Sequence, residues 1–563
     1  MKRTIIVLIT ILLVGCQAQR LPIASPTATA VSTPTPLPTS TATTSSPPTT
    51  IAETLTVPER QPTRTPRPTL TPFPTAPPTA TSPPPLNVTE LVEQLAFETI
   101  EGENGRSLNQ LRVSEYGLRH QYYCEKGPFH WLDNGHLMLF PVVGYTNWYE
   151  NPTMGQVTRP VIISLDGSDP WAADISPTDV CDLPVWSDAL QQVIEAGGGQ
   201  VRLRDLQGSI IETYDGQMPL FLAPSGRRLL AGFTWIDLTT GETVSLGNNG
   251  WVKFPQPAWT TEETRFFECC FGYGDTRTGN YQRRESYPGF WVGGVGVGPG
   301  YFGSRSRWVA NDALVMIEPS NMSFLDESNQ PVVPVIDPEQ QTYVDVVEQL
   351  GLPDTVVTCG PFIAPDGSAF WLSCSEWKDD VTIQQHDPAF LVMLPSFEAM
   401  TVTGKIEFRG WSADSRFMAF TKLADADAGT GTTWLMDTGG SQQQIADEAA
   451  RLADWHDVDP LVAFRFGDQR RLQFVQAATG ADRVLMLDAP VRRVVWQPVD
   501  GGAAVVDENG RIWWLPDPFN PALEPEPLAP LMPDVHSLRW SPDGNRLAFV
   551  SETNLYVVLL EDE

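Results

Sequence analysis

The stretch RWSPDGNRLAFVS, residues 539–551, decides the fold. Its tryptophan ends one strand, S-P-D-G makes a tight turn, and L-A-F-V-S starts a buried strand. Proline fixes φ at the turn, aspartate bonds to the following backbone, and glycine accepts a positive φ. A second apolar run at residues 555–560 predicts another strand. This stretch therefore predicts an antiparallel β unit with a turn of defined chemistry.

The same frame, an aromatic residue followed by a polar turn and an apolar strand, recurs along the chain. Ten such marks lie about 35–55 residues apart, which suits four short strands per unit. The marks are Trp131, Trp186, Phe221, Trp259, Trp308, Phe362, Trp411, Trp455, Trp496 and Trp540. Regular spacing of this kind favours an all-β repeat array.

The W-S-P-D-G-x-x-L-A-F core, followed by a further strand, resembles the propeller repeat of TolB-type and other WD-repeat-like bacterial proteins. The resemblance is strong at residues 540–551, good at 411–420, 362–373 and 221–233, and degenerate elsewhere between about residues 110 and 561. It implies a β-propeller, a fold that more often serves as a binding platform than as an enzyme. Nothing here matches the separate N-terminal α/β domain of TolB, so the partners of TolB are not implied.

The number of blades follows from how the marks are counted. Ten marks taken literally give ten blades, whereas single rings usually have about four to eight. We expect about eight, within a range of 7–10, if some marks are insertions or turns inside a blade. The last repeat leaves no room for an outer strand before residue 563. A segment within residues 111–124 is therefore expected to complete the last blade and close the ring, which leaves no open edge.

The N-terminus reads as a targeting segment. A cationic start, Met1 to Arg3, precedes an apolar run at residues 4–14 that ends in LVGC. LVGC resembles the lipobox of bacterial lipoproteins, which implies cleavage before Cys16 and attachment of lipid to its sulfur. An ordinary signal peptide with a chance cysteine is the alternative. The resemblance predicts an extracytoplasmic, surface-exposed protein that is lipid-anchored to the cell membrane.

Four regions follow from composition. Residues 1–15 are the expected signal peptide, and residues 16–86 are the lipidated cysteine and a Pro/Thr/Ser-rich stalk. Such a stretch has too little apolar surface to fold, and its prolines favour an extended spacer. Residues 87–109 are expected to form an entrance helix, over NVTELVEQLAF at 87–97, and a loop. Residues 110–563 are the expected propeller domain.

Net charge limits the choice of partner. The 563 residues carry a net charge of -31, and residues 1–86 hold six basic and two acidic residues, so the remainder carries about -35. A surface this acidic repels phosphate backbones, so nucleic acid is not expected as a partner. It could hold cations loosely, although solubility is the simpler interpretation. We expect a monomer.

Sequence motifs for catalysis are missing. The nucleophile elbow G-x-S-x-G, H-E-x-x-H and the phosphate-binding loop do not occur. The best metal candidate is DADAG, in which Asp425 and Asp427 precede a glycine and could gather calcium. A solvated hairpin tip explains the same letters, and no cofactor is expected. We therefore expect no enzymatic activity.

Six cysteines remain after Cys16, an even number that suits disulfide bonds in an exported protein. Cys359 and Cys374 flank one turn, so they could face each other across adjacent strands. The adjacent pair Cys269 and Cys270 would point to opposite faces of a strand, and its pairing is left open. A disulfide between Cys359 and Cys374 is the specific prediction.

The leading functional hypothesis is a surface module that binds an unknown protein, glycan or envelope component. The longest loops, expected at residues 145–159, 272–306 and 375–388, are the candidate contact sites. Aromatic residues that could anchor a ligand there are Trp148, Trp291, Tyr301 and Trp377. The alternative is an extracytoplasmic propeller glycan hydrolase or lyase. It would need two carboxyl groups about 5–10 Å apart at the central channel.

Overall fold

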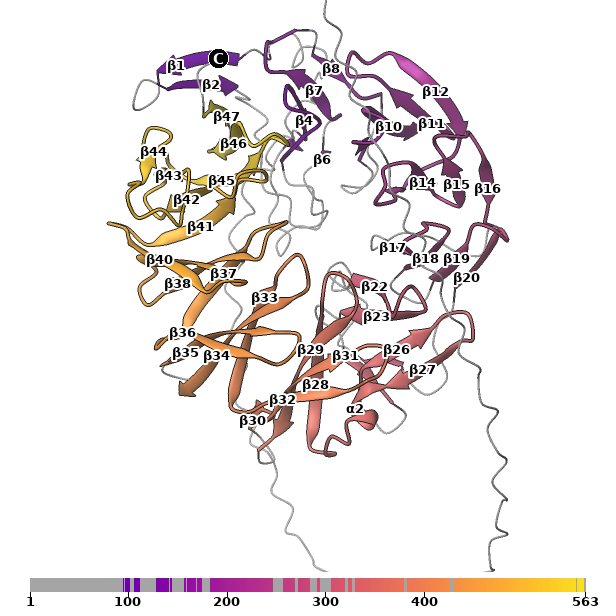
Figure 1. Cartoon of the computed structure of the whole chain (residues 1–563). Helices are drawn as coiled ribbons and strands as arrows, with labels where there is room; N and C mark the ends of the chain where they lie inside the picture. The colour runs from indigo at the N-terminus through magenta and orange to yellow at the C-terminus, as the bar shows by residue number, and fades with distance from the viewer. Residues whose placement is uncertain are drawn as a thin grey trace, which may run out of the picture. The chain divides into compact units, whose positions relative to one another are not determined.

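Each of the ten aromatic marks lies in the last two residues of the first strand of a separate antiparallel sheet. The computed structural model describes residues 95, 97–101, 106–111, 128–140, 142–143, 156–157, 159–168, 170–174, 183–246, 257–268, 272–283, 291–293, 305–318, 323–326, 330–378, 382–425, 430–552 and 554–560. Within them, ten sheets follow one another around a ring as the blades of a β-propeller (Figure 1). The predicted fold class is therefore confirmed.

The first five blades use consecutive strands, apart from two insertions. Blade one contains β3 (Phe129–Trp131), β4 (His136–Leu139), β7 (Val161–Ser164) and β8 (Trp171–Ala172), with the inserted hairpin β5 (Val142–Val143) and β6 (Gln156–Val157). Blade two contains β9 (Val185–Ser187), β10 (Gln192–Gly197), β11 (Gln200–Arg204) and β12 (Ile210–Asp215). Blade three contains β13 (Leu220–Leu222), β14 (Arg228–Ala231), β15 (Thr234–Asp237) and β16 (Thr243–Ser245). Blade four contains β17 (Ala258–Trp259), β18 (Arg265–Glu268), β19 (Gly272–Asp275) and β20 (Asn280–Arg283). Blade five contains β22 (Arg305–Val309), β23 (Leu314–Glu318), β26 (Pro334–Asp337) and β27 (Thr342–Asp345), with a small added sheet of β21 (Trp291–Gly293), β24 (Ser323–Leu325) and β25 (Pro331–Val332).

The second half of the ring is more regular. A short helix, α2 (Val346–Gln349), precedes blade six, which contains β28 (Val356–Ile363), β29 (Ala369–Trp377), β31 (Ala389–Met393) and β32 (Ala399–Val402), with β30 (Ile383–Gln385) paired to β29. Blade seven contains β33 (Lys405–Trp411), β34 (Phe417–Asp425), β35 (Thr430–Asp437) and β36 (Gln442–Ala446). Blade eight contains β37 (Ala450–Trp455), β38 (Leu461–Phe466), β39 (Arg471–Gln476) and β40 (Ala481–Met486). Blade nine contains β41 (Val491–Trp496), β42 (Ala503–Asp507), β43 (Ile512–Leu515) and β44 (Glu526–Pro527). Blade ten contains β45 (Val535–Trp540), β46 (Arg546–Ser551), β47 (Asn554–Leu559), β2 (Ser107–Leu111) and β1 (Phe97–Glu101).

The number of blades is ten, at the upper end of the predicted range. The favoured value of about eight was too low, because every mark begins its own sheet and none is an internal turn. The expected loop at residues 272–306 contains β19, β20 and β21, so the first part of it completes blade four. Among the described residues, no helix is long and apolar enough to cross a membrane.

The turn after the mark of blade ten is built as its sequence predicts. In blade ten, the Ser541 amide donates to the Arg546 carbonyl over 2.8 Å, and the Ser541 hydroxyl donates to the Asp543 carboxylate over 2.5 Å. Gly544 has a φ of +74°, and a Cβ there would lie 2.8 Å from Cγ of Gln497 in blade nine. Glycine is therefore needed for both the turn conformation and the close approach of the neighbouring blade.

Hydrogen bonds between these turns tie most neighbouring blades together. In the described residues they join eight pairs of neighbouring blades, and the side chain or the backbone can be the donor. The bonded pairs are Ser187–Gly226, Ser225–Glu263, Thr261–Asp312, Ala310–Gly367, Asp366–Ser415, His456–Gln497, Gln497–Gly544 and Asp543–Asn134. The last pair links blade ten to blade one, so this chain of contacts also closes the ring.

The tryptophans of the marks add a second set of bonds between blades. The indole N–H of Trp496 donates to the Asp454 carbonyl over 2.9 Å, one residue before the mark of the preceding blade. Trp131, Trp308 and Trp540 make the same bond, and Trp411 donates to the carbonyl of Phe362 itself. Each such tryptophan thus fills core volume and satisfies a backbone carbonyl at the next first strand.

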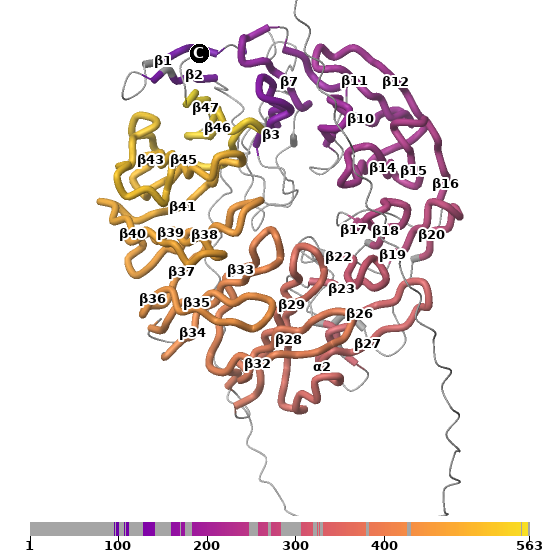
Figure 2. Tube along the Cα trace, viewed as in Figure 1, coloured from indigo at the N-terminus to yellow at the C-terminus, as the bar shows by residue number. Residues whose placement is uncertain are grey.

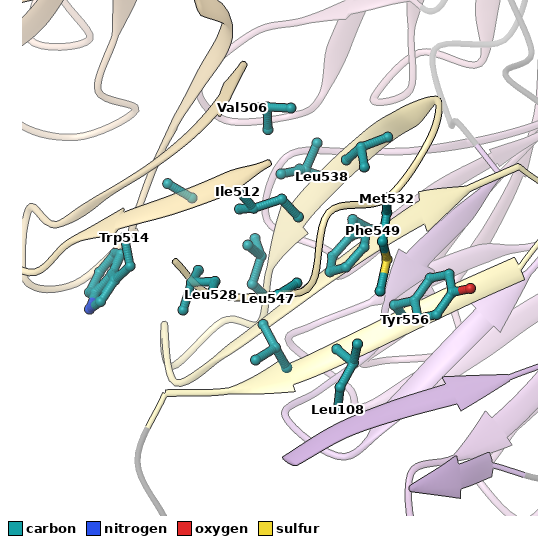
Figure 3. Packing of buried hydrophobic residues seen from close by; sticks show 14 of the residues in the cluster. Leu108, Val506, Ile512, Trp514, Leu528, Met532, Leu538, Leu547, Phe549 and Tyr556 are labelled. Carbon is teal, nitrogen blue, oxygen red and sulfur yellow. The ribbon is translucent and has the colours of Figure 1, made fainter. Parts of the chain in front are cut away.

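The hydrophobic core is divided among the junctions. Each of ten clusters combines residues from two neighbouring blades. Figure 3 shows the junction of blades nine and ten, where Trp514 and Ile512 meet Phe549 and Leu547. Because both faces of a blade are buried in this way, the second strands of most blades are largely apolar, as in β42 and β46.

The ring closes by joining the two ends of the domain. β2 pairs antiparallel with β47, with Leu108 opposite Val558 and Leu111 opposite Leu555, and β1 pairs outside β2. Figure 2 shows β1 and β2 from the start of the chain beside β46 and β47 from its end. Closure by an N-terminal segment was therefore predicted correctly, but the segment is residues 107–111 and not 111–124.

The N-terminal boundary of the propeller also differs from expectation. Residues 97–101 and 107–111 are strands of blade ten, so the entrance region at 87–109 belongs in part to the propeller. Leu108 enters the cluster between blades nine and ten, and Leu111 enters the one between blades ten and one. Apart from Leu95 and Phe97, the predicted helix at 87–97 lies outside the described residues.

Candidate functional site

The predicted ligand-contact residues are only partly described. Trp377 ends β29, and its side chain is 44% exposed. Trp291 begins β21, while its side chain, Trp148 and Tyr301 lie outside the described residues. Whether the four aromatics converge on one face stays a prediction.

The other predicted site residues fall in two places. Cys359 in β28 and Cys374 in β29 stand directly opposite each other and form a disulfide bond with an S–S distance of 2.00 Å. Asp425 ends β34, and Asp427 and Cys16 lie outside the described residues. Within the described part of the chain, no group of three or more histidine, cysteine or acidic side chains is arranged to hold a metal. Calcium therefore stays a hypothesis without support.

The first strands of the blades carry an unexpected charge. In a propeller these strands border the central channel, and in Figure 1 the fourth strands β12, β16 and β20 lie along the outside. The ten first strands contain eight basic and only two acidic residues, in a chain with a net charge of -31. The first strands therefore carry net positive charge in an acidic protein.

Most of this charge lies on four consecutive blades. Blades seven to ten contribute six basic residues, which we name the basic arc: Lys405, Arg409, Arg451, Arg492, Arg493 and Arg539. Blade five adds Arg307, whose guanidinium donates to the Pro365 carbonyl over 2.6 Å. The first strands of blades one to four contain no lysine or arginine. The charge is thus concentrated on one side of the ring.

The basic arc contains exposed cations. Lys405 and Arg451 are exposed and their side chains make no hydrogen bond or ion pair with other described residues, whereas the exposed Arg493 interacts electrostatically with Asp454. Arg492 is half exposed and donates to the Val535 carbonyl of blade ten over 3.2 Å. The exposed side chains of Lys405, Arg451 and Arg493 are therefore accessible to a ligand.

The charge of Arg493 affects charged groups on the neighbouring blades. Burial, and then the positive charge of Arg493, lower the pKa of Arg539. The same guanidinium helps to oppose the burial that raises the pKa of Asp454. Arg493 therefore acts across blades eight, nine and ten, and the repulsion between cations there would be relieved by an anion.

Arg409 is positioned by its own blade. It pairs with Glu407, and its Nε lies 3.4 Å from Oγ1 of Thr421. Burial lowers the pKa of Arg409, and the charge of Glu407 opposes this effect. A partly buried guanidinium that keeps its charge is costly for stability, which indicates a role beyond packing.

An aromatic pair adjoins the basic arc at the junction of blades six and seven. Phe362, near the end of the first strand β28, is 43% exposed. Its ring stacks on Phe408 of β33 with centroids 4.7 Å apart, and Phe408 in turn stacks on Trp371 at 5.9 Å. Because one side of Phe362 is packed in this way, its exposed side presents an apolar face on the first strand of blade six, the blade before the arc.

The two carboxylates of the first strands are both engaged. Glu407 pairs with Arg409, and Asp454 lies 3.1 Å from the guanidinium of Arg465. Arg465 is itself buried and donates to the Val491 carbonyl over 3.3 Å. Neither carboxylate is placed as a free acid or base of the kind that hydrolysis of a glycan requires.

The basic arc is the feature that sequence reasoning missed. A signal for it exists, since each of the last four repeats places a lysine or arginine within six residues before its mark, as in KIEFRGW and VRRVVW. Without knowing that this strand borders the channel, the same residues read as ordinary solvated charges. The topology places these residues on the first strands of four consecutive blades.

The comparisons with known proteins show the fold alone. No protein-family model and no curated protein matches this sequence. An oligogalacturonate lyase in complex with manganese is similar with 12% identity and a TM-score of 0.32, over 83% of this chain and 97% of that one. A eukaryotic initiation factor has 10% identity and a TM-score of 0.40, over 71% and 91%. Dipeptidyl peptidase 4 of Porphyromonas gingivalis has 9% identity and a TM-score of 0.35, over 70% and 65%.

Proposed function

We propose that this chain is a lipid-anchored β-propeller that binds a partner at the channel end of blades seven to ten. The observation that carries the proposal is the basic arc, which concentrates cations on the first strands of an acidic protein. A local positive charge on a protein with negative net charge attracts partners with negative charge and orients them. The partner is a protein, glycan or envelope component with exposed negative charge.

The anchor and the stalk give this module its setting. The lipobox resemblance at Cys16 and the Pro/Thr-rich residues 17–86 support display outside the cytoplasm at some distance from the membrane. The TolB-type and WD-repeat-like pattern of the marks supports a platform role, because blades of this kind are packed core and binding uses their rims. On this proposal the protein holds a partner near the envelope and carries out no reaction.

The alternative, a glycan hydrolase or lyase, receives less support. It needs a pair of carboxyl groups at the channel that can act as acid and base. Glu407 and Asp454 are the acidic residues of the described first strands, and each is paired with an arginine. Turnover of a glycan or peptide by the purified protein would overturn the binding proposal.

A pull-down tests the proposed function. The full-length chain, solubilised from membranes, is incubated with cell-envelope extract and compared with the double variant Arg451→Gln/Arg493→Gln. The proposal predicts a partner that the natural chain retains and the variant loses. Equal recovery by both proteins would remove the basic arc from the binding surface.

A further inference from the structure

We infer that the basic arc and the Phe362–Phe408 pair together bind a linear acidic polysaccharide, one whose sugar units carry carboxylates. This inference rests on the proposed function and names the ligand class of the same site. Two independent features carry it, namely cations on the first strands of four consecutive blades and an exposed aromatic ring on the first strand of the blade before them. Each feature selects a different part of such a polymer.

The cations select a chain with repeated negative charge. Six basic residues lie on the first strands of four consecutive blades, with two acidic residues among them. A ligand with a single charge would contact only a small part of the basic arc. Guanidinium groups match carboxylates through paired hydrogen bonds, so a polymer with a carboxylate on each sugar unit offers suitable acceptors to several of these cations.

The exposed side chains are those best placed to make the contact. Arg451 of blade eight and Arg493 of blade nine are exposed, and neither side chain makes a hydrogen bond to another described residue. No hydrogen bond has to be broken before they bind. Arg493 interacts with Asp454, but it also repels Arg539, whose pKa is lowered by burial and then by Arg493, and an anion would relieve this repulsion.

The aromatic pair favours binding of a sugar polymer over an inorganic one. Phe362 is 43% exposed, and stacking on Phe408 at 4.7 Å holds its ring in place. The C–H face of a sugar ring can cover an aromatic ring and remove apolar surface from water. A polyphosphate has the negative charge but no apolar face, so it could not use this part of the site.

A binding titration with defined polymers tests the inference. The full-length chain is titrated by calorimetry with polygalacturonate fragments, with the same fragments after methyl esterification, and with inorganic polyphosphate. We expect binding of the acidic fragments alone, and affinity that falls as salt is added. Arg451→Gln/Arg493→Gln should weaken this binding at least about tenfold, since two charge-assisted contacts are lost.

Matched variants exclude a general effect of charge. Arg277→Gln/Arg470→Gln removes the same two charges from exposed turns outside the first strands, at residues paired with Asp275 and Asp468. This control should bind the acidic fragments as the natural chain does. Phe362→Leu should weaken binding of the glycan about threefold to tenfold and should leave any residual binding of polyphosphate unchanged.

The outcomes also separate this inference from the proposed function. Equal binding of polyphosphate and polygalacturonate, or equal loss in the control variant, would overturn the assignment to an acidic glycan. If no polymer binds but the pull-down partner still depends on Arg451 and Arg493, the ligand class is wrong and the binding function stands. If that dependence is missing as well, both are wrong.

Discussion

The innermost and outermost strands of this propeller are edges of the same ten sheets, yet they carry opposite charge. The first strands contain eight basic and two acidic residues. The last strands of the blades contain seven acidic and two basic residues. Because sheet pairing is alike at both edges, this difference does not come from the fold.

The two edges face different physical demands. An outer strand is open to pairing with other chains, and charged residues there prevent such association. The inner strands are protected by the ring, since a foreign strand cannot easily approach them along the channel. Charges on the inner strands are therefore not needed against aggregation, and partial burial of Arg409 and Arg539 makes them costly. We attribute their presence to binding.

The largest effect is expected at the outermost strands of blade ten. Deleting residues 97–111 removes β1 and β2, exposes β47, and takes the fully buried Leu108 and Leu111 out of two clusters. Each lost leucine should cost about 2–5 kcal/mol, so the melting temperature should fall steeply. A deletion of residues 26–80 in the stalk is the control and should leave the melting temperature unchanged. Equal melting temperatures would mean that β2 does not hold the ring closed.

An intermediate effect is expected on an inner strand. The Cys359–Cys374 bridge ties the first strand of blade six to its second strand across 15 residues. Closing a loop of this length is worth about 3 kcal/mol, which the double variant Cys359→Ser/Cys374→Ser should lose in chemical denaturation. Peptide mapping without reductant should recover both cysteines in one linked species. Two free thiols would contradict the pairing.

A smaller effect distinguishes two inner tryptophans. Trp496 donates to the Asp454 carbonyl, whereas the buried indole N–H of Trp455 has no acceptor among the described residues. Trp496→Phe should therefore destabilise the fold by about 1 kcal/mol more than Trp455→Phe, as judged by urea unfolding. Similar costs for the two variants would show that the bond between blades contributes little.

The smallest effect concerns two carboxyl groups whose pKa values are shifted in opposite directions. Hydrogen bonding by Ser168 lowers the pKa of Asp166, in the exposed turn after β7, to about 2, whereas burial raises the pKa of the inner Asp454 above 3.8. The stabilisation from Asp166 is complete above 3.8 and is lost as the pH falls towards 2. Any contribution from Asp454 has the reverse sign, being largest below 3.8 and lost as the pH rises through its folded value. An NMR titration of the carboxyl groups should give a lower pKa for Asp166 than for Asp454. Equal pKa values would contradict this contrast.

The sequence was sufficient to predict the repeat but not the number of blades. The residues Pro542, Asp543 and Gly544 predict the turn of the last repeat, since they set the local backbone geometry. The number of blades depends on whether degenerate marks such as Trp186 and Trp259 begin sheets, and this is decided by packing between distant residues. Statistics for smaller rings led to an estimate that was too low.

Two features depend on tertiary structure. The closing strand β2 was placed wrongly, and the basic arc was missed. β2 has the weakly patterned sequence SLNQL, and its strand character comes from pairing with β47 at the other end of the chain. The basic arc combines residues from four repeats, each of which holds only one or two cations. Neither is visible in one repeat, because each arises from how the repeats are assembled.

The central claim is that the inner strands of blades seven to ten form the binding surface, and arginine footprinting tests it most directly. The full-length chain is treated with an arginine-specific reagent, with and without the partner from the pull-down, and the modified residues are quantified by mass spectrometry. The account predicts that the partner protects Arg451 and Arg493 and leaves Arg277 and Arg470 as reactive as before. Protection of Arg277 or Arg470, with Arg451 and Arg493 still fully reactive, would contradict it.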